Sequence, residues 1–137
     1  MDRQLRRPAL VFMAVTVAAV LVACGSSFVE VAIDDSKNGQ SVQVHVGDVV
    51  KVTLHSTEWT FDPSSDPSAL VRLGNQVVAP DPVGTCFPGM GCGVTTAWYK
   101  ALSAGSAAVS ATRVSCGEAR RCVGDEGVYR VTVVVIA

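Results

Sequence analysis

Apolar and polar residues alternate along much of the chain, and this alternation limits the fold more than any other feature. Residues 42–46, 50–54 and 129–135 each place an apolar side chain at every second position. Successive side chains of a β-strand point to opposite faces, so each segment is expected to be a strand with one buried face. No segment repeats apolar residues with helical spacing over more than two turns. The sequence therefore predicts an all-β fold.

Short turns separate these segments. Gly47-Asp48 and Ser103-Ala104-Gly105 have the residue types of tight turns, and a polar turn is expected at residues 34–39. Seven to nine short strands with regular turns are typical of a β-sandwich. The remaining strands are expected at residues 28–33, 59–61, 69–73, 76–79, 95–102 and 107–111.

The first 23 residues have the features of a secretory leader. Arg3, Arg6 and Arg7 precede an apolar run at residues 9–23, which is too short to be a good membrane-spanning helix. The run ends in Leu-Val-Ala-Cys, which resembles a bacterial lipobox with Cys24 as the lipidated residue. We therefore expect a signal peptide at 1–23, a lipidated N-terminus and short tether at 24–27, and one domain at 28–137.

This leader predicts a lipid-anchored protein on the extracytoplasmic face of the cell membrane. Bacterial lipoproteins carry at least two acyl chains, palmitate among them, which is enough for stable anchoring. The alternative is an ordinary signal peptide that is cut after Ala23 without lipid addition.

Charge argues against nucleic acid as a partner. The leader holds three of the 11 basic and one of the 12 acidic residues, so the remainder is slightly acidic and has no basic stripe. The partners expected instead are the membrane, through the lipid on Cys24, and an envelope protein or a protease.

Four cysteines remain beyond Cys24, and an even number in a small exported domain predicts structural disulfides. Cys86 and Cys92 lie six residues apart, as do Cys116 and Cys122. This spacing is longer than zinc sites favour, and neither pair is a C-x-x-C motif. Pairing within each loop is favoured. Nested pairing, Cys92 with Cys116 and Cys86 with Cys122, is the alternative if residues 95–114 form a plain hairpin.

Several short motifs carry a family resemblance across residues 40–136. They are Val-Gly-Asp at 46–48, Trp59, Tyr-Lys-Ala at 99–101 and Ala-Gly-Ser-Ala at 104–107. The chain resembles immunoglobulin-like bacterial domains, chagasin-type cysteine-protease inhibitors and small actinobacterial lipoproteins of unassigned function. This resemblance implies an immunoglobulin-like β-sandwich with residues 56–58, 86–93 and 116–122 at one end.

Chagasin-type inhibitors block a protease cleft with three loops, and this chain matches them unevenly. The first inhibitor loop carries N-P-T-T-G, whereas residues 55–58 are His-Ser-Thr-Glu. The second carries G-x-G-G, and residues 89–93 (Gly-Met-Gly-Cys-Gly) come near it. The third carries an arginine, a proline and an aromatic. Arg113 is a match for the arginine, but Val114 and Ser115 follow it.

Two groups of loop residues are candidate binding elements. Phe87, Pro88 and Met90 form an apolar plug on a stiff loop, because an ordered aromatic residue binds at low entropic cost. In the alternative, Phe87 folds back and caps the core. The second group consists of Glu118, Arg120 and Arg121, whose arginines can grip a carboxylate or phosphate or simply be solvated.

No residue pattern supports catalysis, a metal site or a cofactor. His45 and His55 are the only histidines, and together with Asp48 they are too few ligands for a metal. No serine lies in a nucleophile motif. Trp59 is expected in the core, and one of Trp98 and Tyr99 must face outward. The sequence thus predicts a non-catalytic binding or scaffolding module, with a chagasin-like inhibitor as the alternative.

Overall fold

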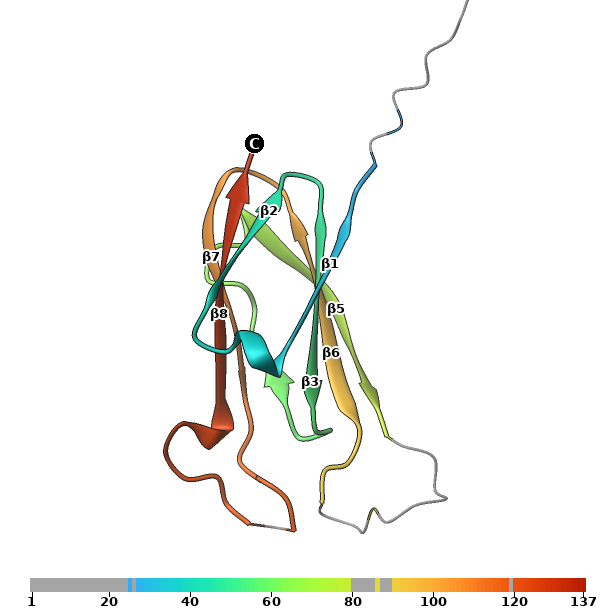
Figure 1. The fold of residues 1–137 in the computed structure, drawn as a ribbon, viewed down its shortest axis with the longest axis vertical. Helices are drawn as coiled ribbons and strands as arrows, with labels where there is room; N and C mark the ends of the chain where they lie inside the picture. Colours follow the sequence, from blue (N-terminus) through green and yellow to red (C-terminus); the bar gives the residue numbers. More distant parts are fainter. Residues whose placement is uncertain (1–24, 26, 80–85, 87–89, 119) are drawn as a thin grey trace, which may run out of the picture.

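Two four-stranded β-sheets pack face to face around one hydrophobic core (Figure 1). The computed structural model describes residue 25, residues 27–79, residue 86, residues 90–118 and residues 120–137. The strands are β1 (Glu30–Asp34), β2 (Ser41–His45), β3 (Val49–His55), β4 (Thr60–Phe61), β5 (Leu70–Val78), β6 (Val94–Ala101), β7 (Gly105–Thr112) and β8 (Val128–Ile136).

The strand order is that of an immunoglobulin-like sandwich. One sheet has the order β1-β3-β6-β5 and the other β2-β8-β7-β4. Apart from β2, which adds to the edge of β8, this corresponds to the two sheets of a seven-strand immunoglobulin domain. The pairs β1–β3 and β2–β8 are parallel, and the other neighbouring strands are antiparallel. The expected all-β sandwich of seven to nine strands is confirmed.

Alternation along the strands builds the core as the sequence predicts. The apolar residues of β3 at positions 50, 52 and 54 and those of β8 at positions 129, 131, 133 and 135 are all buried. Trp59 is buried as expected, and Tyr99 is buried while its neighbour Trp98 is partly exposed. Each sheet therefore buries one face, as its pattern requires.

Two buried tyrosines satisfy their hydroxyl groups on backbone carbonyls. Tyr99 donates to the carbonyl of Asp62 at 3.0 Å, and Tyr129 donates to that of Asp34 at 3.1 Å. Burial raises the pKa of Tyr99 to about 12 and raises the pKa of Tyr129 further. Both hydroxyls thus remain neutral donors that tie the strands to neighbouring loops.

The structure differs from the sequence prediction in three local features. Residues 69–79 form one strand, β5, with a bulge at Arg72/Gly74, rather than two short segments. Val46 lies in the turn after β2 and is exposed. The turn at residues 34–39 contains a 3-10 helix, η1 (Asp35–Lys37), and a second one, η2 (Gly124–Gly127), precedes β8. No helix in the described part of the chain is long and apolar enough to cross a bilayer.

Candidate functional site

Three loops meet at one end of the sandwich, the lower end in Figure 1. The first loop joins β3 to β4 (residues 56–59), the second joins β5 to β6 (residues 79–93), and the third joins β7 to β8 (residues 113–127). We call the described parts of these loops the loop tip. For the residues that the structure describes, the sequence prediction that these segments share one end is confirmed.

Backbone hydrogen bonds join the first loop to the second. The amide of Ser56 donates to the carbonyl of Gly93, and the amide of Thr57 donates to that of Gly91, both at 2.9 Å. The buried hydroxyl of Thr95, at the start of β6, donates to the carbonyl of Ser56 at 2.9 Å. The first loop is therefore held at three points, two in the second loop and one at the start of β6.

Two glycines make this close approach possible. A Cβ on Gly91 would lie 2.7 Å from the hydroxyl of Ser56 and 2.9 Å from the Cγ of Glu58. Gly93 has φ of +115°, and a Cβ there would collide with the carbonyl of Val78. The glycines that resemble the G-x-G-G motif thus have a packing role in this chain.

The disulfide Cys116–Cys122 closes the third loop. Inside it, the amide of Cys116 donates to the carbonyl of Arg120 at 2.7 Å, and the amide of Arg120 donates to that of Gly117 at 2.8 Å. Gly117 and Glu118 both have positive φ, at +100° and +48°. Closing such a short loop stabilises the fold by about 2.4 kcal/mol in the chain-entropy model.

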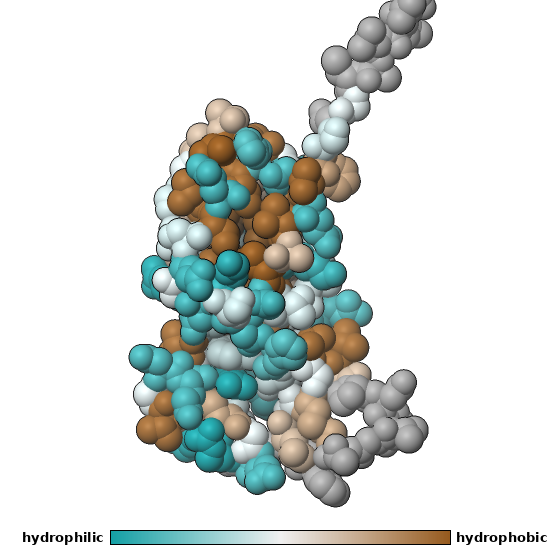
Figure 2. All heavy atoms as spheres, in the orientation of Figure 1, coloured by the Kyte–Doolittle hydropathy of each residue, from teal (hydrophilic) through white to brown (hydrophobic). Residues whose placement is uncertain are grey.

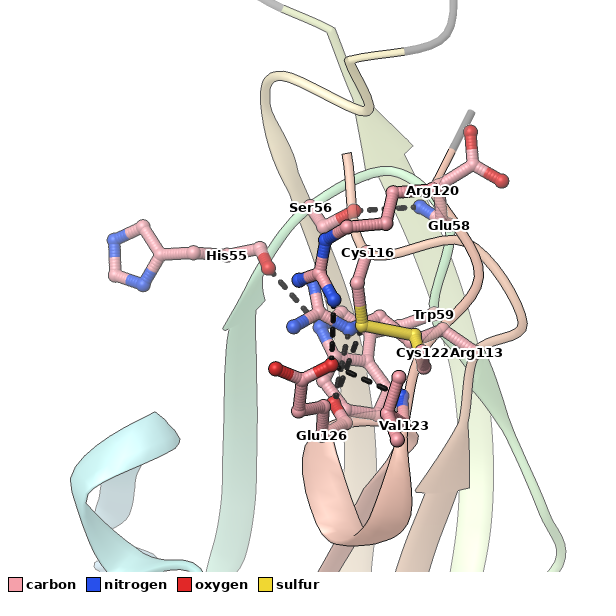
Figure 3. Close-up of a disulfide and its surroundings, with 10 residues drawn as sticks. All are labelled: His55, Ser56, Glu58, Trp59, Arg113, Cys116, Arg120, Cys122, Val123 and Glu126. Atoms are coloured by element: carbon pink, nitrogen blue, oxygen red, sulfur yellow. Dashed lines mark hydrogen bonds and ion pairs between the residues drawn. A yellow bond between two sulfur atoms is a disulfide. The ribbon is translucent and has the colours of Figure 1, made fainter. Parts of the chain in front are cut away.

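Glu126 organises the base of the third loop (Figure 3). Its carboxylate accepts hydrogen bonds from the guanidinium of Arg120 at 2.9 Å and from the amide of Val123 at 3.0 Å. The hydrogen bond from Arg120, followed by that from Val123, holds the pKa of Glu126 below its usual range. Arg120 therefore binds its own loop. Arg120 and Arg121 could bind a carboxylate or phosphate together only if Arg120 released Glu126.

Arg113 and Trp59 join the third loop to the first (Figure 3). The guanidinium of Arg113 lies 4.5 Å from the centre of the indole ring, and its Nε donates to the carbonyl of Glu126 at 3.3 Å. The indole nitrogen of Trp59 donates to the carbonyl of His55 at 3.0 Å. The arginine that resembles the third inhibitor motif therefore packs on the buried tryptophan of the sandwich core.

The second and third loops also approach each other. The carbonyl of Met90 lies 3.8 Å from where a Cβ on Gly117 would stand. Met90 is partly exposed, and Glu118 and Arg121 are exposed. The predicted plug residues Phe87 and Pro88 lie outside the described residues. Of the three predicted plug residues, Met90 is therefore the one that the structure places in the loop tip.

The disulfides follow the pairing favoured from the sequence. Cys86 is bonded to Cys92, with a Cα–Cα distance of 6.0 Å, and Cys116 is bonded to Cys122, with 4.9 Å. The nested alternative requires β6 and β7 to form a plain hairpin, but these strands belong to different sheets. Each bridge thus stabilises one loop and leaves the loops joined by hydrogen bonds and packing.

The two histidines lie at opposite ends of the sandwich. His55 ends β3 at the loop tip, and its imidazole is 2.6 Å from the carboxylate of Asp35. His45 ends β2 at the other end, with its ring 3.8 Å from the carboxylate of Asp48. The described residues contain no cluster of three or more possible metal ligands.

Sequence reasoning did not identify Glu126 or the contact between Arg113 and Trp59. The spacing of Glu126, three residues after Val123, is a signal typical of a carboxylate that accepts from the start of a helical turn. The contact of Arg113 has no such local signal, because Trp59 is distant in the sequence and lies on another strand connection.

Comparisons with known proteins agree with the fold. No protein-family model matches the sequence, and no curated protein matches it significantly. The cysteine protease inhibitor EhICP2 from Entamoeba histolytica has a similar structure, with a TM-score of 0.55 and 10% identity over 82% of this chain and 100% of that chain. Amebosin has a TM-score of 0.54 and 13% identity over 78% of this chain and 98% of its own. At the level of the fold, the expected chagasin-type similarity is confirmed.

Proposed function

We propose that this protein is a non-catalytic inhibitor that inserts its loop tip into the cleft of a papain-type cysteine protease. The observation that carries the proposal is the joining of three loops, by backbone hydrogen bonds and by Arg113 on Trp59, at one end of a sandwich similar to EhICP2. Loops that are already ordered lose little conformational entropy on binding, so such a tip is suited to a preformed cleft.

The second and third loops would carry most of the contact. The first loop is short and packs closely against the second, at Ser56 and Glu58 beside Gly91. Met90, Glu118 and Arg121 are the candidate residues that the tip offers to a partner. The second loop is also the one whose glycines resemble the inhibitor motif.

A proposed lipid on Cys24 would hold this inhibitor at the extracytoplasmic face of the membrane. The first strand, β1, begins at the end of the sandwich opposite to the loop tip (Figure 1). An anchor there would leave the tip free to meet a protease in the surrounding space. This orientation supports an inhibitor that protects the cell surface.

Titration of the mature domain against a papain-type protease, followed with a fluorogenic peptide, tests the proposal. Met90→Asp places a charge in the tip and should weaken inhibition at least about tenfold, a loss of about 1.4 kcal/mol. Lys100→Glu changes an exposed charge on β6 and should leave inhibition unchanged. Absence of inhibition at micromolar protein would contradict the protease assignment.

A binding module for another envelope protein is the second candidate. Its support is the departure of the first and third loops from the inhibitor motifs, since residues 55–58 and 113–115 lack the expected proline, glycine and aromatic residues. A pull-down from the native envelope, with Met90→Asp as the matched control, would identify such a partner. Recovery of one envelope protein by the parent domain alone would favour this candidate.

A further inference from the structure

Four exposed apolar side chains lie at the end of the sandwich opposite to the loop tip. Phe28 and Val29 are 70% and 57% exposed, and Val46 and Leu102 are 45% and 46% exposed. Figure 2 shows hydrophobic residues concentrated on the upper half of the visible face, where the N-terminal segment leaves the domain. We call these four residues the apolar end.

Hydrogen bonds fix the apolar end as one surface. The amide of Val49 donates to the carbonyl of Val29 at 3.0 Å, and the amide of Val29 donates to the carboxylate of Asp48 at 3.2 Å. The amide of Gly47 donates to the carbonyl of Ala101 at 2.9 Å. The start of β1, the turn after β2 and the turn after β6 are therefore held side by side.

Both oxygens of the Asp48 carboxylate accept hydrogen bonds from backbone amides at this end of the sandwich. The carboxylate accepts from the amides of Val29 and His45, at 3.2 and 2.9 Å, and Asp48 is only 7% exposed. Of the described charged or titratable side chains near this end, Glu30, His45 and Lys100 are exposed, and the carboxylate of Glu30 lies 3.8 Å from the ammonium of Lys51. No large charge of one sign therefore surrounds the four apolar side chains.

Residues 24–27, the tether, keep the apolar end close to any lipid on Cys24. This part of the inference rests on the lipid anchoring proposed above. Five residue steps separate Cys24 from Val29, which span at most about 18 Å when fully extended. The polar headgroup region adds about 5 to 8 Å to each side of the hydrocarbon core. The apolar end can therefore reach the interface easily and cannot move far from it.

We propose that the apolar end lies directly on the bilayer, with Phe28, Val29, Val46 and Leu102 at the boundary between headgroups and acyl chains. Apolar side chains next to a lipid anchor add binding free energy by leaving water. The sandwich would then stand upright, and the loop tip would be about 30 Å above the interface, the length of a nine-residue strand. The domain is in this way oriented as well as tethered.

Tryptophan fluorescence of the lipidated full chain in phosphatidylcholine vesicles tests this placement. Val46→Trp puts a reporter in the apolar end, and Val123→Trp puts one in the third loop, where Val123 is 70% exposed. Acyl chains brominated near the headgroup should quench the added emission of Val46→Trp and leave that of Val123→Trp unchanged. The parent protein, with Trp59 and Trp98, supplies the baseline.

Each outcome of this experiment is decisive. If the protein sediments with the vesicles but Val46→Trp is not quenched, the domain stands off the membrane and the proposal is wrong. A blue shift of Val46→Trp without quenching would show that a second copy covers the surface, which also overturns it. If the protein does not sediment with the vesicles, the lipid anchoring itself fails.

Adding Leu102→Asp to Val46→Trp should reduce quenching, because a charge next to the reporter opposes insertion.

Discussion

The contact between Arg113 and Trp59 should be worth a measurable free energy, because it joins the third loop to the first. The guanidinium lies 4.5 Å from the centre of the indole ring, and Trp59 is only 7% exposed. Arg113→Met keeps a long side chain but removes the cation, and Trp59→Leu removes the aromatic face. Together these variants define a double-mutant cycle for the contact.

The structure sets the expected magnitudes. A cation over an aromatic ring contributes about 0.5 to 2 kcal/mol, depending on exposure. The long hydrogen bond from Arg113 to Glu126, 3.3 Å and exposed, adds little, so Arg113→Met should lower the free energy of unfolding by about 1 to 2 kcal/mol. For a domain of about 110 residues this corresponds to a fall in Tm of about 4 to 8 °C. Trp59→Leu should cost about 2 to 4 kcal/mol, since it empties part of the core.

Urea denaturation of the parent, both single variants and the double variant measures the coupling. We expect the double variant to be more stable than additivity predicts by about 0.5 to 2 kcal/mol. Lys51 and Trp98 supply a matched control, because the Lys51 ammonium is 6.0 Å from that ring on an open sheet face and its cycle should be close to additive. Additivity at Arg113 and Trp59 within about 0.3 kcal/mol would refute the reasoning.

Three further predictions concern the anchor, acid stability and a buried hydroxyl. Cys24→Ala should release the protein from membranes or leave the uncleaved precursor, and unchanged mass with unchanged membrane fractionation would refute lipidation. The lowered pKa of Glu126 stabilises the folded state above about pH 4.3, the value of an unfolded glutamate, and this stabilisation is lost as the pH falls through the folded pKa. Thermal melts should therefore fall less steeply below about pH 5 for Glu126→Gln than for the parent; parallel profiles would argue against the role of Arg120. Tyr129→Phe removes the hydrogen bond to the carbonyl of Asp34 and should cost about 0.5 to 1.5 kcal/mol by urea denaturation.

Local sequence pattern predicted the strands of the fold well. A strand buries every second side chain, so the alternation at residues 50–54 and 129–135 identifies β3, β8 and their inward faces without knowledge of their neighbours. The bulge at Arg72/Gly74 broke the same pattern, because an extra residue shifts the alternation within a strand. That shift made β5 look like two segments.

Some features of the loop tip depend on residues close in sequence and others on residues far apart. Pairing of Cys116 with Cys122 and the glycines of the second loop were readable from the sequence, because each depends on a few neighbouring residues. The parallel pairing of β1 with β3 and the contact of Arg113 with Trp59 were not predicted, because each joins residues far apart in the sequence. The binding of Arg120 to Glu126 spans only six residues, so it was missed although it is a local contact.

The sequence by itself determined most of the strand segments and their turns, and it favoured the pairing of cysteines within each loop. Only the tertiary structure decided which loops touch and which apolar residues remain exposed at the end opposite to the loop tip. The physical reason is that strand alternation and turn chemistry act between residues close in sequence. Contacts across two packed sheets join residues up to about a hundred positions apart, such as Tyr129 and Asp34, whose separation is 95 residues, and no local pattern records them.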